Sequence, residues 1–336
     1  SFTTLTKVLQ ALTPFSLTSD KMKYIILFFL SITTLWAQDT TATKRYHYKV
    51  WIKPSLSINY LAVDIEDSPI NINLKNKTIL PNYPLTMGLG LGVHNTYVNL
   101  DYARGLMPLR NENKYGKTSY FDFQLHSFIS NKFLLDIYYQ SYKGFYYENA
   151  QDIHLLKDAR VQQIGSEFLY FTKWRETSLK NIFNPEGEPL KPFFSFYFGG
   201  GVFHHKLSLP LVDPDRTDDF KHIQAGFSGG VANLWQLAPN LTFSGLIGLG
   251  FYFGGETAPI SKMKINQYVN FRYNIALTYK IKSSTIDFSI LHNNKRVYFN
   301  DSDLVSIKNS TFRISFTQQL NVTTRHNNKV MRFLGM

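Results

Sequence analysis

The chain has 336 residues, no cysteine and a net charge of +12, and 44% of its residues are hydrophobic, 16% aromatic and 18% charged. Disordered chains are poor in aromatic residues and rich in charge, so this composition predicts a folded protein. The lack of cysteine excludes a disulfide framework, a cysteine-ligated metal site and thiol catalysis.

The first apolar segment has the features of a secretory signal. Residues 24–36, YIILFFLSITTLW, have about the length of a signal-peptide core and are too short to cross a bilayer as a helix. They follow Lys-Met-Lys at 21–23, and Ala37 provides a cleavage point. A buried core helix is the alternative, but a polar stretch without helical periodicity follows at once. We expect residues 1–21 to be an upstream extension, 22–37 a cleaved signal peptide, and the mature protein to be exported.

Apolar and polar residues alternate along most of the mature chain. In residues 48–60 the even positions are apolar and the odd positions are polar, with Trp51 as the exception, which is the pattern of a β-strand. The same alternation recurs and predicts twelve strands. They are expected near residues 48–60, 85–93, 98–102, 121–125, 133–140, 161–172, 192–204, 220–235, 240–254, 267–281, 284–299 and 309–320.

The lengths of the connections predict the topology. Links after the even-numbered strands are mostly tight turns, with 173–191 as the exception. Long links follow the odd-numbered strands, near residues 61–83, 105–117, 143–160, 205–219, 255–266 and 300–308. This arrangement is typical of outer-membrane β-barrels. We expect an all-β, antiparallel, up-and-down transmembrane barrel of about 12 strands over residues 38–320, with short periplasmic turns, long external loops and a basic tail at 321–336.

A soluble secreted β-sandwich or lipocalin-like protein is the competing architecture, with its apolar rows turned inward. The apolar rows in 241–253 and 269–281 contain no charged residue. A lysine or arginine facing lipid costs about 2–4 kcal/mol at the bilayer midplane, so uncharged rows suit lipid contact. The opposite rows hold Gly, Ser, Thr, Asn, Gln and Tyr with few charges, unlike a water-facing sheet. Row composition therefore favours the membrane barrel.

Three strings between residues 80 and 149 carry a family resemblance: LPNYPLTMGLGLG, GKTSYFDFQLHSF and LLDIYYQSYKGFYYEN. They resemble the bacterial family labelled domain of unknown function 4421, exported proteins of Bacteroidetes-type bacteria. The motif Tyr-Lys-Gly-Phe-Tyr at 142–146 is the most specific piece. The resemblance implies a barrel in the outer membrane of a Gram-negative bacterium, and it implies no activity.

Six charged residues fall in polar rows that would line the interior. They are Asp101, Asp122, Asp136, Arg272, Lys280 and Arg313. In a closed ring of twelve strands, the acids on the third to fifth strands would face the bases on the tenth and twelfth. Such an arrangement would create a transverse field that orients polar solutes and selects ions. The alternative is that these residues pair with one another and with Tyr120, Tyr138 and Tyr268 to fill the interior, as in small barrels.

A histidine- and aspartate-rich segment is the best candidate for a cation site in an external loop. It contains His204, His205, Asp213, Asp215, Asp218, Asp219 and His222. Carboxylates suit Ca²⁺ and imidazoles suit Zn²⁺, although the spacing of an EF-hand loop is missing. A solvated acidic loop is the alternative reading, and we predict no bound metal or cofactor.

One stretch invites comparison with a lipid-processing barrel enzyme, in which a histidine would activate a serine near the outer rim. It consists of His292, Asn293 and Asn294, with Ser302 and Asp303 in the following loop. The spacing matches no recognisable catalytic motif, so we assign no catalytic residue.

These patterns favour a non-enzymatic outer-membrane barrel that acts as a narrow pore or as a structural or binding protein at the surface. A lipid-processing barrel enzyme and a soluble secreted binding protein are the alternatives. The expected partners are outer-membrane lipid, lipopolysaccharide and the barrel assembly machinery, with a small polar solute as cargo of a pore. Nucleic acid is not expected, because the basic residues are scattered.

Overall fold

The computed structural model describes residues 46–65, 76–82, 85–93, 96–104, 110–130, 132–149, 152–173, 192–213, 216–256, 266–299 and 303–324. The chain divides into two units, residues 48–322 with 330–336 and residues 1–47 with 323–329. The first unit contains the sheet. The predicted extension at 1–21, the predicted signal peptide at 22–37 and the tail beyond residue 324 lie outside the described residues.

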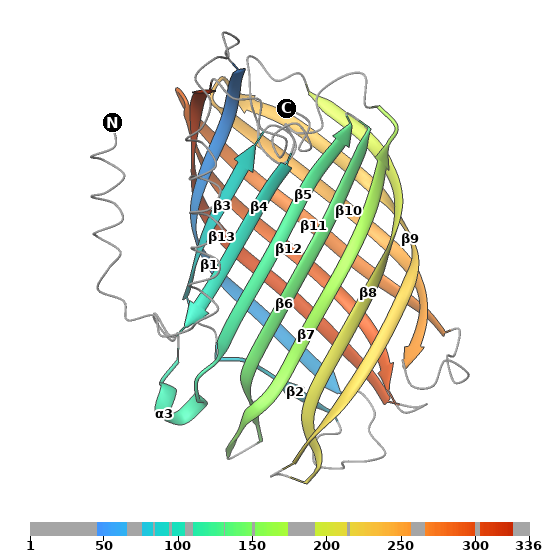
Figure 1. Cartoon of the computed structure of the whole chain (residues 1–336). Coiled ribbons are helices and arrows are strands. Elements are labelled where there is room, and N and C mark those ends of the chain that lie inside the picture. Colours follow the sequence, from blue (N-terminus) through green and yellow to red (C-terminus); the bar gives the residue numbers. More distant parts are fainter. Residues whose placement is uncertain are drawn as a thin grey trace. The chain divides into compact units, whose positions relative to one another are not determined.

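Thirteen strands form one antiparallel sheet (Figure 1). They are β1 (Tyr46–Ile65), β2 (Lys77–Ile79), β3 (Leu85–Val93), β4 (Thr96–Arg104), β5 (Ser119–Ser130), β6 (Phe133–Glu148), β7 (Ile153–Phe171), β8 (Phe193–Asp213), β9 (Arg216–Ala238), β10 (Leu241–Glu256), β11 (Asn266–Ile281), β12 (Ser284–Phe299) and β13 (Asp303–Thr324). Neighbours follow chain order from β3 to β13, and β1 pairs with both β3 and β13. The twelve long strands therefore close into a ring, which confirms the predicted barrel and its twelve strands.

The two faces of the wall follow from the alternation of side chains along each strand. On β10 the outward row includes Ile247, Leu249 and Phe251, whose exposed fractions are 41%, 48% and 54%. The inward row of β1 includes Ser57 and Asn59, each 1% exposed. Trp51, the residue that interrupted the predicted alternation of β1, lies in the inward row, where its ring contacts that of Tyr97 with 5.6 Å between centroids. An apolar outward belt and a polar interior result.

The predicted connections at 143–160, 205–219 and 300–308 are largely strand. β6 continues to Glu148 and β7 begins at Ile153, while β8 continues to Asp213 and β9 begins at Arg216. β13 begins at Asp303 and continues to Thr324, past the expected start of the tail at 321. The prediction of long loops at these positions is wrong. Apolar and polar residues continue to alternate there, but the apolar row now faces inward and the polar row faces outward. In these extensions the inward residues include apolar ones such as Ala159 and Leu207, and most outward residues are polar, such as Asp158 and Lys206.

A short crossing segment closes the gap above the shorter strands β3 and β4. β2 pairs with the end of β1, with Val63 opposite Ile79. The next residue, Leu80, exchanges two backbone hydrogen bonds of 2.8 Å with Tyr146 on β6. In the ring, β3, β4 and β5 lie between β1 and β6, so this segment spans their ends. The four-residue helix α3 (Glu112–Tyr115) lies at the same end of the barrel (Figure 1).

No helix among the described segments has the length and apolar character needed to cross a bilayer.

A lysine in the outward belt tests whether this face contacts lipid. We expect Ile247→Lys to lower the free energy of unfolding in lipid vesicles by about 2–4 kcal/mol, because it places a charge in hydrocarbon. Asn240→Lys, at an exposed position in the turn between β9 and β10, serves as the control and should change that free energy by less than about 0.5 kcal/mol. Equal losses for the two variants, measured by urea titration, would show that residue 247 does not face lipid.

Candidate functional site: the barrel interior

The interior side chains change character along the barrel. We call the end with α3 and β2 the long-connection end and the opposite end the short-turn end. Inward residues are apolar at the long-connection end, polar in the middle, and apolar again at the short-turn end of β5 to β10. These three levels decide whether the barrel is open or filled.

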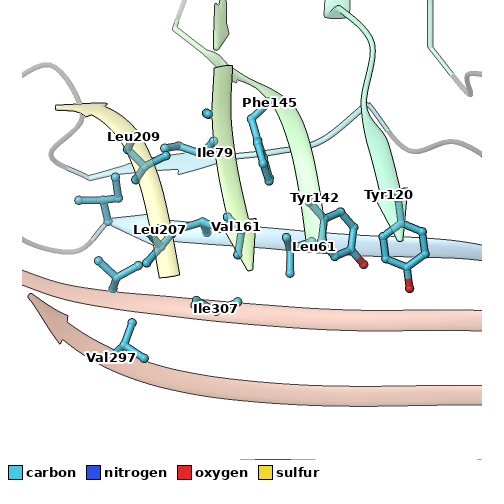
Figure 2. Close-up of a cluster of buried hydrophobic side chains, with 14 residues drawn as sticks. Leu61, Ile79, Tyr120, Tyr142, Phe145, Val161, Leu207, Leu209, Val297 and Ile307 are labelled. Atoms are coloured by element: carbon cyan, nitrogen blue, oxygen red, sulfur yellow. The ribbon is translucent and has the colours of Figure 1, made fainter. Parts of the chain in front are cut away.

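A cluster of fourteen buried side chains, the apolar plug, occupies the long-connection end. It comprises Leu61, Val63, Ile65, Ile79, Tyr120, Tyr142, Phe145, Ala159, Val161, Leu207, Leu209, Val297, Val305 and Ile307. Each is at most 5% exposed. Figure 2 shows side chains from β1, β2, β7, β8, β12 and β13 meeting in one volume. Burying a large aliphatic side chain contributes about 1.5–3 kcal/mol, so the plug also stabilises this end of the ring.

Two ion pairs cross the polar middle level. Arg313 on β13 donates to Asp101 on β4, with β1 and β3 between them in the ring. Arg272 on β11 donates to Glu167 on β7, with β8, β9 and β10 between them. The exposed fractions of Asp101 and Glu167 are 2% and 6%. A charge buried this deeply is costly unless it is paired, so each arginine and its carboxylate depend on one another.

Neutral hydrogen bonds also cross the interior. Asn309 on β13 donates to Gln140 on β6 at 3.1 Å, and Asn270 on β11 donates to Gln224 on β9 at 3.0 Å. Gln224 in turn donates to the carbonyl of Arg296 on β12 at 3.3 Å. These contacts join non-adjacent strands, so side chains occupy the central level of the barrel.

The other predicted interior charges lie as follows. Asp122 accepts hydrogen bonds from Tyr120 at 2.6 Å, Gln124 at 2.8 Å and Gln140 at 3.2 Å. Asp136 lies 2.6 Å from Nδ1 of His126 on the neighbouring strand β5. Lys280 lies in the inward row of β11, one residue before its short-turn end. Tyr138 contacts Phe203 in the interior, and the side chain of Tyr268 is not described. Of the predicted acids and bases, the structure brings Asp101 and Arg313 into direct contact.

Sequence reasoning missed four interior charges among the described residues, namely Glu167, Asp287, Lys53 and Lys295. Glu167 pairs with Arg272, and Asp287 accepts from Thr278 at 2.6 Å and lies 3.5 Å from Lys53. Lys295 is 3% exposed and lies over the rings of Tyr138 and Phe203, at 4.3 and 3.7 Å from their centroids. Each of them lies in the polar row of a predicted strand. Its odd or even position along that strand was therefore the available indication that it faces the interior.

Gly88 is required by the Asp101–Arg313 pair. A Cβ atom at this position would overlap the Asp101 carboxylate, which crosses over β3 on its way to Arg313. The glycines that alternate with leucine in β3 therefore allow β4 side chains to pack against the inner wall.

A cavity of about 110 Å³ remains in the interior. It lies toward the short-turn end, and its lining includes Trp51, Lys53, Asp287 and Arg313. This volume has room for several water molecules and is well below the roughly 300–1,000 Å³ of small-molecule sites. The cavity therefore suits solvation of the charged side chains better than binding of a large ligand.

The predicted cation-binding residues do not form one site among the described residues. His204 and His205 lie within strand β8 and face opposite sides of the wall, since successive residues alternate. Asp219 is outward, beyond the apolar belt, where the Lys206 ammonium and the Ser208 hydroxyl hold its pKa below the usual range. The side chains of Asp213 and Asp218, and Asp215 as a whole, are not described. No group of three metal-ligating side chains occurs in the described part of the chain.

His292 lies on the outward face of β12, and its Nδ1 is 2.7 Å from Oγ of Ser310 on β13. Its ring stacks on Tyr273 with 5.0 Å between centroids. Asn293 and Asn294 face opposite sides of the wall, Ser302 lies outside the described residues, and the side chain of Asp303 is not described. Among the described side chains, His292 contacts no carboxylate of the kind that orients a catalytic histidine.

The family comparison identifies the class of protein. Residues 37–318 match the family described as Domain of unknown function (DUF4421). The chain belongs to this family, which extends the resemblance seen at residues 80–149 over most of its length.

Solved structures similar to this chain include several membrane barrels. The translocator domain of the autotransporter NalP from Neisseria meningitidis is 8% identical, with 89% of this chain and 96% of that chain covered and a TM-score of 0.43. The beta domain of the Bordetella autotransporter BrkA is 10% identical, with 82% and 100% covered and a TM-score of 0.40. The COG4313 outer membrane channel from Pseudomonas putida F1 is 6% identical, with 84% and 100% covered and a TM-score of 0.33. No curated protein matches the chain.

The Asp101–Arg313 pair can be tested by removing one or both charges. Asp101→Asn leaves Arg313 buried without its anionic partner, so we expect the free energy of unfolding to fall by about 3–5 kcal/mol. The double variant Asp101→Asn/Arg313→Gln removes both charges and should recover most of this loss. Urea titration of the protein folded in vesicles measures both values. A double variant at least as destabilised as the single one would contradict the dependence of each charge on the other.

Proposed function

We propose that the chain is an outer-membrane β-barrel with a filled interior, which does not conduct solutes in this conformation and acts as a structural or binding protein at the cell surface. Four features support the location: the closed ring, the uncharged outward belt, the unequal connections at the two ends, and the predicted export signal. Closed barrels satisfy every backbone group in hydrocarbon, and outer-membrane barrels place their longer connections outside. The long-connection end is therefore assigned to the cell exterior.

The filled-barrel proposal rests on one observation: side chains contact one another across the interior at successive levels of the barrel. The Arg313–Asp101 and Arg272–Glu167 pairs cross the middle level. The apolar plug fills the external end, and a second cluster that includes Phe171, Phe193 and Leu234 lines the short-turn end of β5 to β10. A solute passing through would have to break buried ion pairs and pass an apolar layer that offers it no hydrogen bonds.

A structural or surface-binding role is supported by the strand extensions at the external end. β8 and β9 have 21 and 23 residues, whereas a membrane strand needs about 9–11. The wall formed by β6 to β9 therefore continues past the belt, and ion pairs such as Lys143–Asp158 lie on its outer surface. We propose that this wall is the part of the protein that meets the cell exterior.

Planar-bilayer conductance tests the filled-barrel proposal. The refolded protein should give no stepwise ion conductance in a membrane in which a general porin, inserted as a control, conducts. Insertion is verified separately by a change of gel mobility on heating. Regular conductance steps from the unmodified protein would contradict the filled interior.

A narrow pore is the second candidate, favoured by the polar middle level and its cavity of about 110 Å³. In that case the apolar plug would be the only barrier, and Leu61→Ser/Val161→Ser would produce conductance. The filled-barrel proposal predicts that this variant stays silent, because the ion pairs of the middle level remain. Conductance of the variant would support the pore instead.

A further inference from the structure

The outward rows of β6 to β9 change from apolar to charged at one level. On β7, the outward residues Phe168 and Ile164 are 40% and 48% exposed. Arg160 lies in the same row, four residues before Ile164 and closer to the long-connection end. On β8, Val202 is 55% exposed and is followed by His204 and Lys206 in the same row. Under the proposed function, this level is the outer edge of the lipid belt.

Four basic residues, which we call the basic rim, lie together at this edge. They are Lys143, Arg160, Lys206 and Lys221. Lys143 is directly opposite Arg160 on β7, and Lys206 is directly opposite Lys221 on β9. Arg160 and Lys206 are diagonal neighbours across β7 and β8, since Arg160 is opposite Ser208 and Gln162 is opposite Lys206. The basic rim is therefore continuous over four strands.

This arrangement is unfavourable for the isolated protein. Side chains directly opposite in an antiparallel pair have Cβ atoms about 4.5–5.5 Å apart, and like charges there are destabilising. Two acids offset part of the charge, with Asp158 at 3.0 Å from Lys143 and Asp219 at 2.7 Å from Lys206. Arg160 and Lys221 are exposed and have no ion-pair partner among the described residues. The rim keeps two positive charges available to an external anion.

We infer that the basic rim binds the phosphate groups of a phosphorylated glycolipid in the outer leaflet. The inference rests on the proposed function, which gives the orientation of the barrel in the membrane. The acyl chains of such a lipid would lie over the belt, where Phe168, Val202 and Phe227 are 40%, 55% and 75% exposed. A phosphate joined to these chains would meet Arg160 and Lys221 at the edge of the belt. Arginine forms paired hydrogen bonds with phosphate oxygens, and a lysine adds a point charge.

The experiment compares two double variants that remove equal charge. Arg160→Gln/Lys221→Gln alters the rim, and Lys114→Gln/Lys117→Gln alters two exposed lysines on and beside α3. Each protein is titrated in detergent with lipid A, and with lipid A from which the phosphates have been removed, and native mass spectrometry measures the bound fraction. Each basic residue near an anionic headgroup contributes about a factor of five in affinity. We expect the rim variant to bind lipid A about ten- to thirtyfold more weakly and the control variant to stay within about twofold of the unmodified protein.

Either of two results would overturn the inference. The first is that the unmodified protein binds both forms of lipid A equally, which would show that the acyl chains alone are recognised. The second is that the two double variants lose affinity to the same extent, which would indicate a general charge effect. Insertion into phosphatidylcholine vesicles, measured in parallel, separates this inference from the proposed function. Failure of the unmodified protein to insert would contradict the membrane barrel, whereas normal insertion without phosphate preference would reject only the basic rim.

Discussion

Closure of the ring by the β13–β1 pairing is the constraint on which the rest of the structure depends. In hydrocarbon, an unpaired backbone N–H or C=O group has no water to bond, so a sheet can cross only if its edges meet. Twelve strands enclose a space wider than that of the smallest, side-chain-filled barrels and narrower than that of wide porins. The chain fills this space with its own side chains, which makes the choice of inward residues as important as the outward belt.

The wall exchanges the chemistry of its two faces at the level of the basic rim. Below that level, in the middle of the barrel, the outward residues are apolar and the inward residues are mainly polar, as Phe198 and Glu167 illustrate. Beyond it, the outward residues are charged and the inward residues form the apolar plug. Both halves obey the same rule, because the apolar face turns toward whichever side lacks water. One set of strands thus serves as a membrane wall and as the shell of a small hydrophobic core.

Alternation along the sequence predicted the strands, their number and the outward belt because these depend on local periodicity alone. The extensions of β6 to β9 were missed because their polar outward rows resemble loop sequence. Which side chains meet across the interior depends on the stagger between strands in the closed ring. The sequence of a single strand does not determine this stagger. Arg272 therefore meets Glu167 rather than one of the acids proposed for it, while Arg313 meets Asp101. The crossing made by β2 has only three strand residues and carries no periodic signal.

The cysteine-free chain allows a direct measurement of whether side chains fill the interior. A single Asn309→Cys substitution places a thiol in the middle level, and Lys308→Cys places one on the outward face as a control, since Lys308 has a 48% exposed side chain. The rate of reaction with a small, charged, membrane-impermeant thiol reagent is measured in vesicles and again after unfolding. We predict rapid labelling at residue 308, and labelling at residue 309 only after unfolding. Equally rapid labelling at both positions in the folded protein would show an open, water-filled interior.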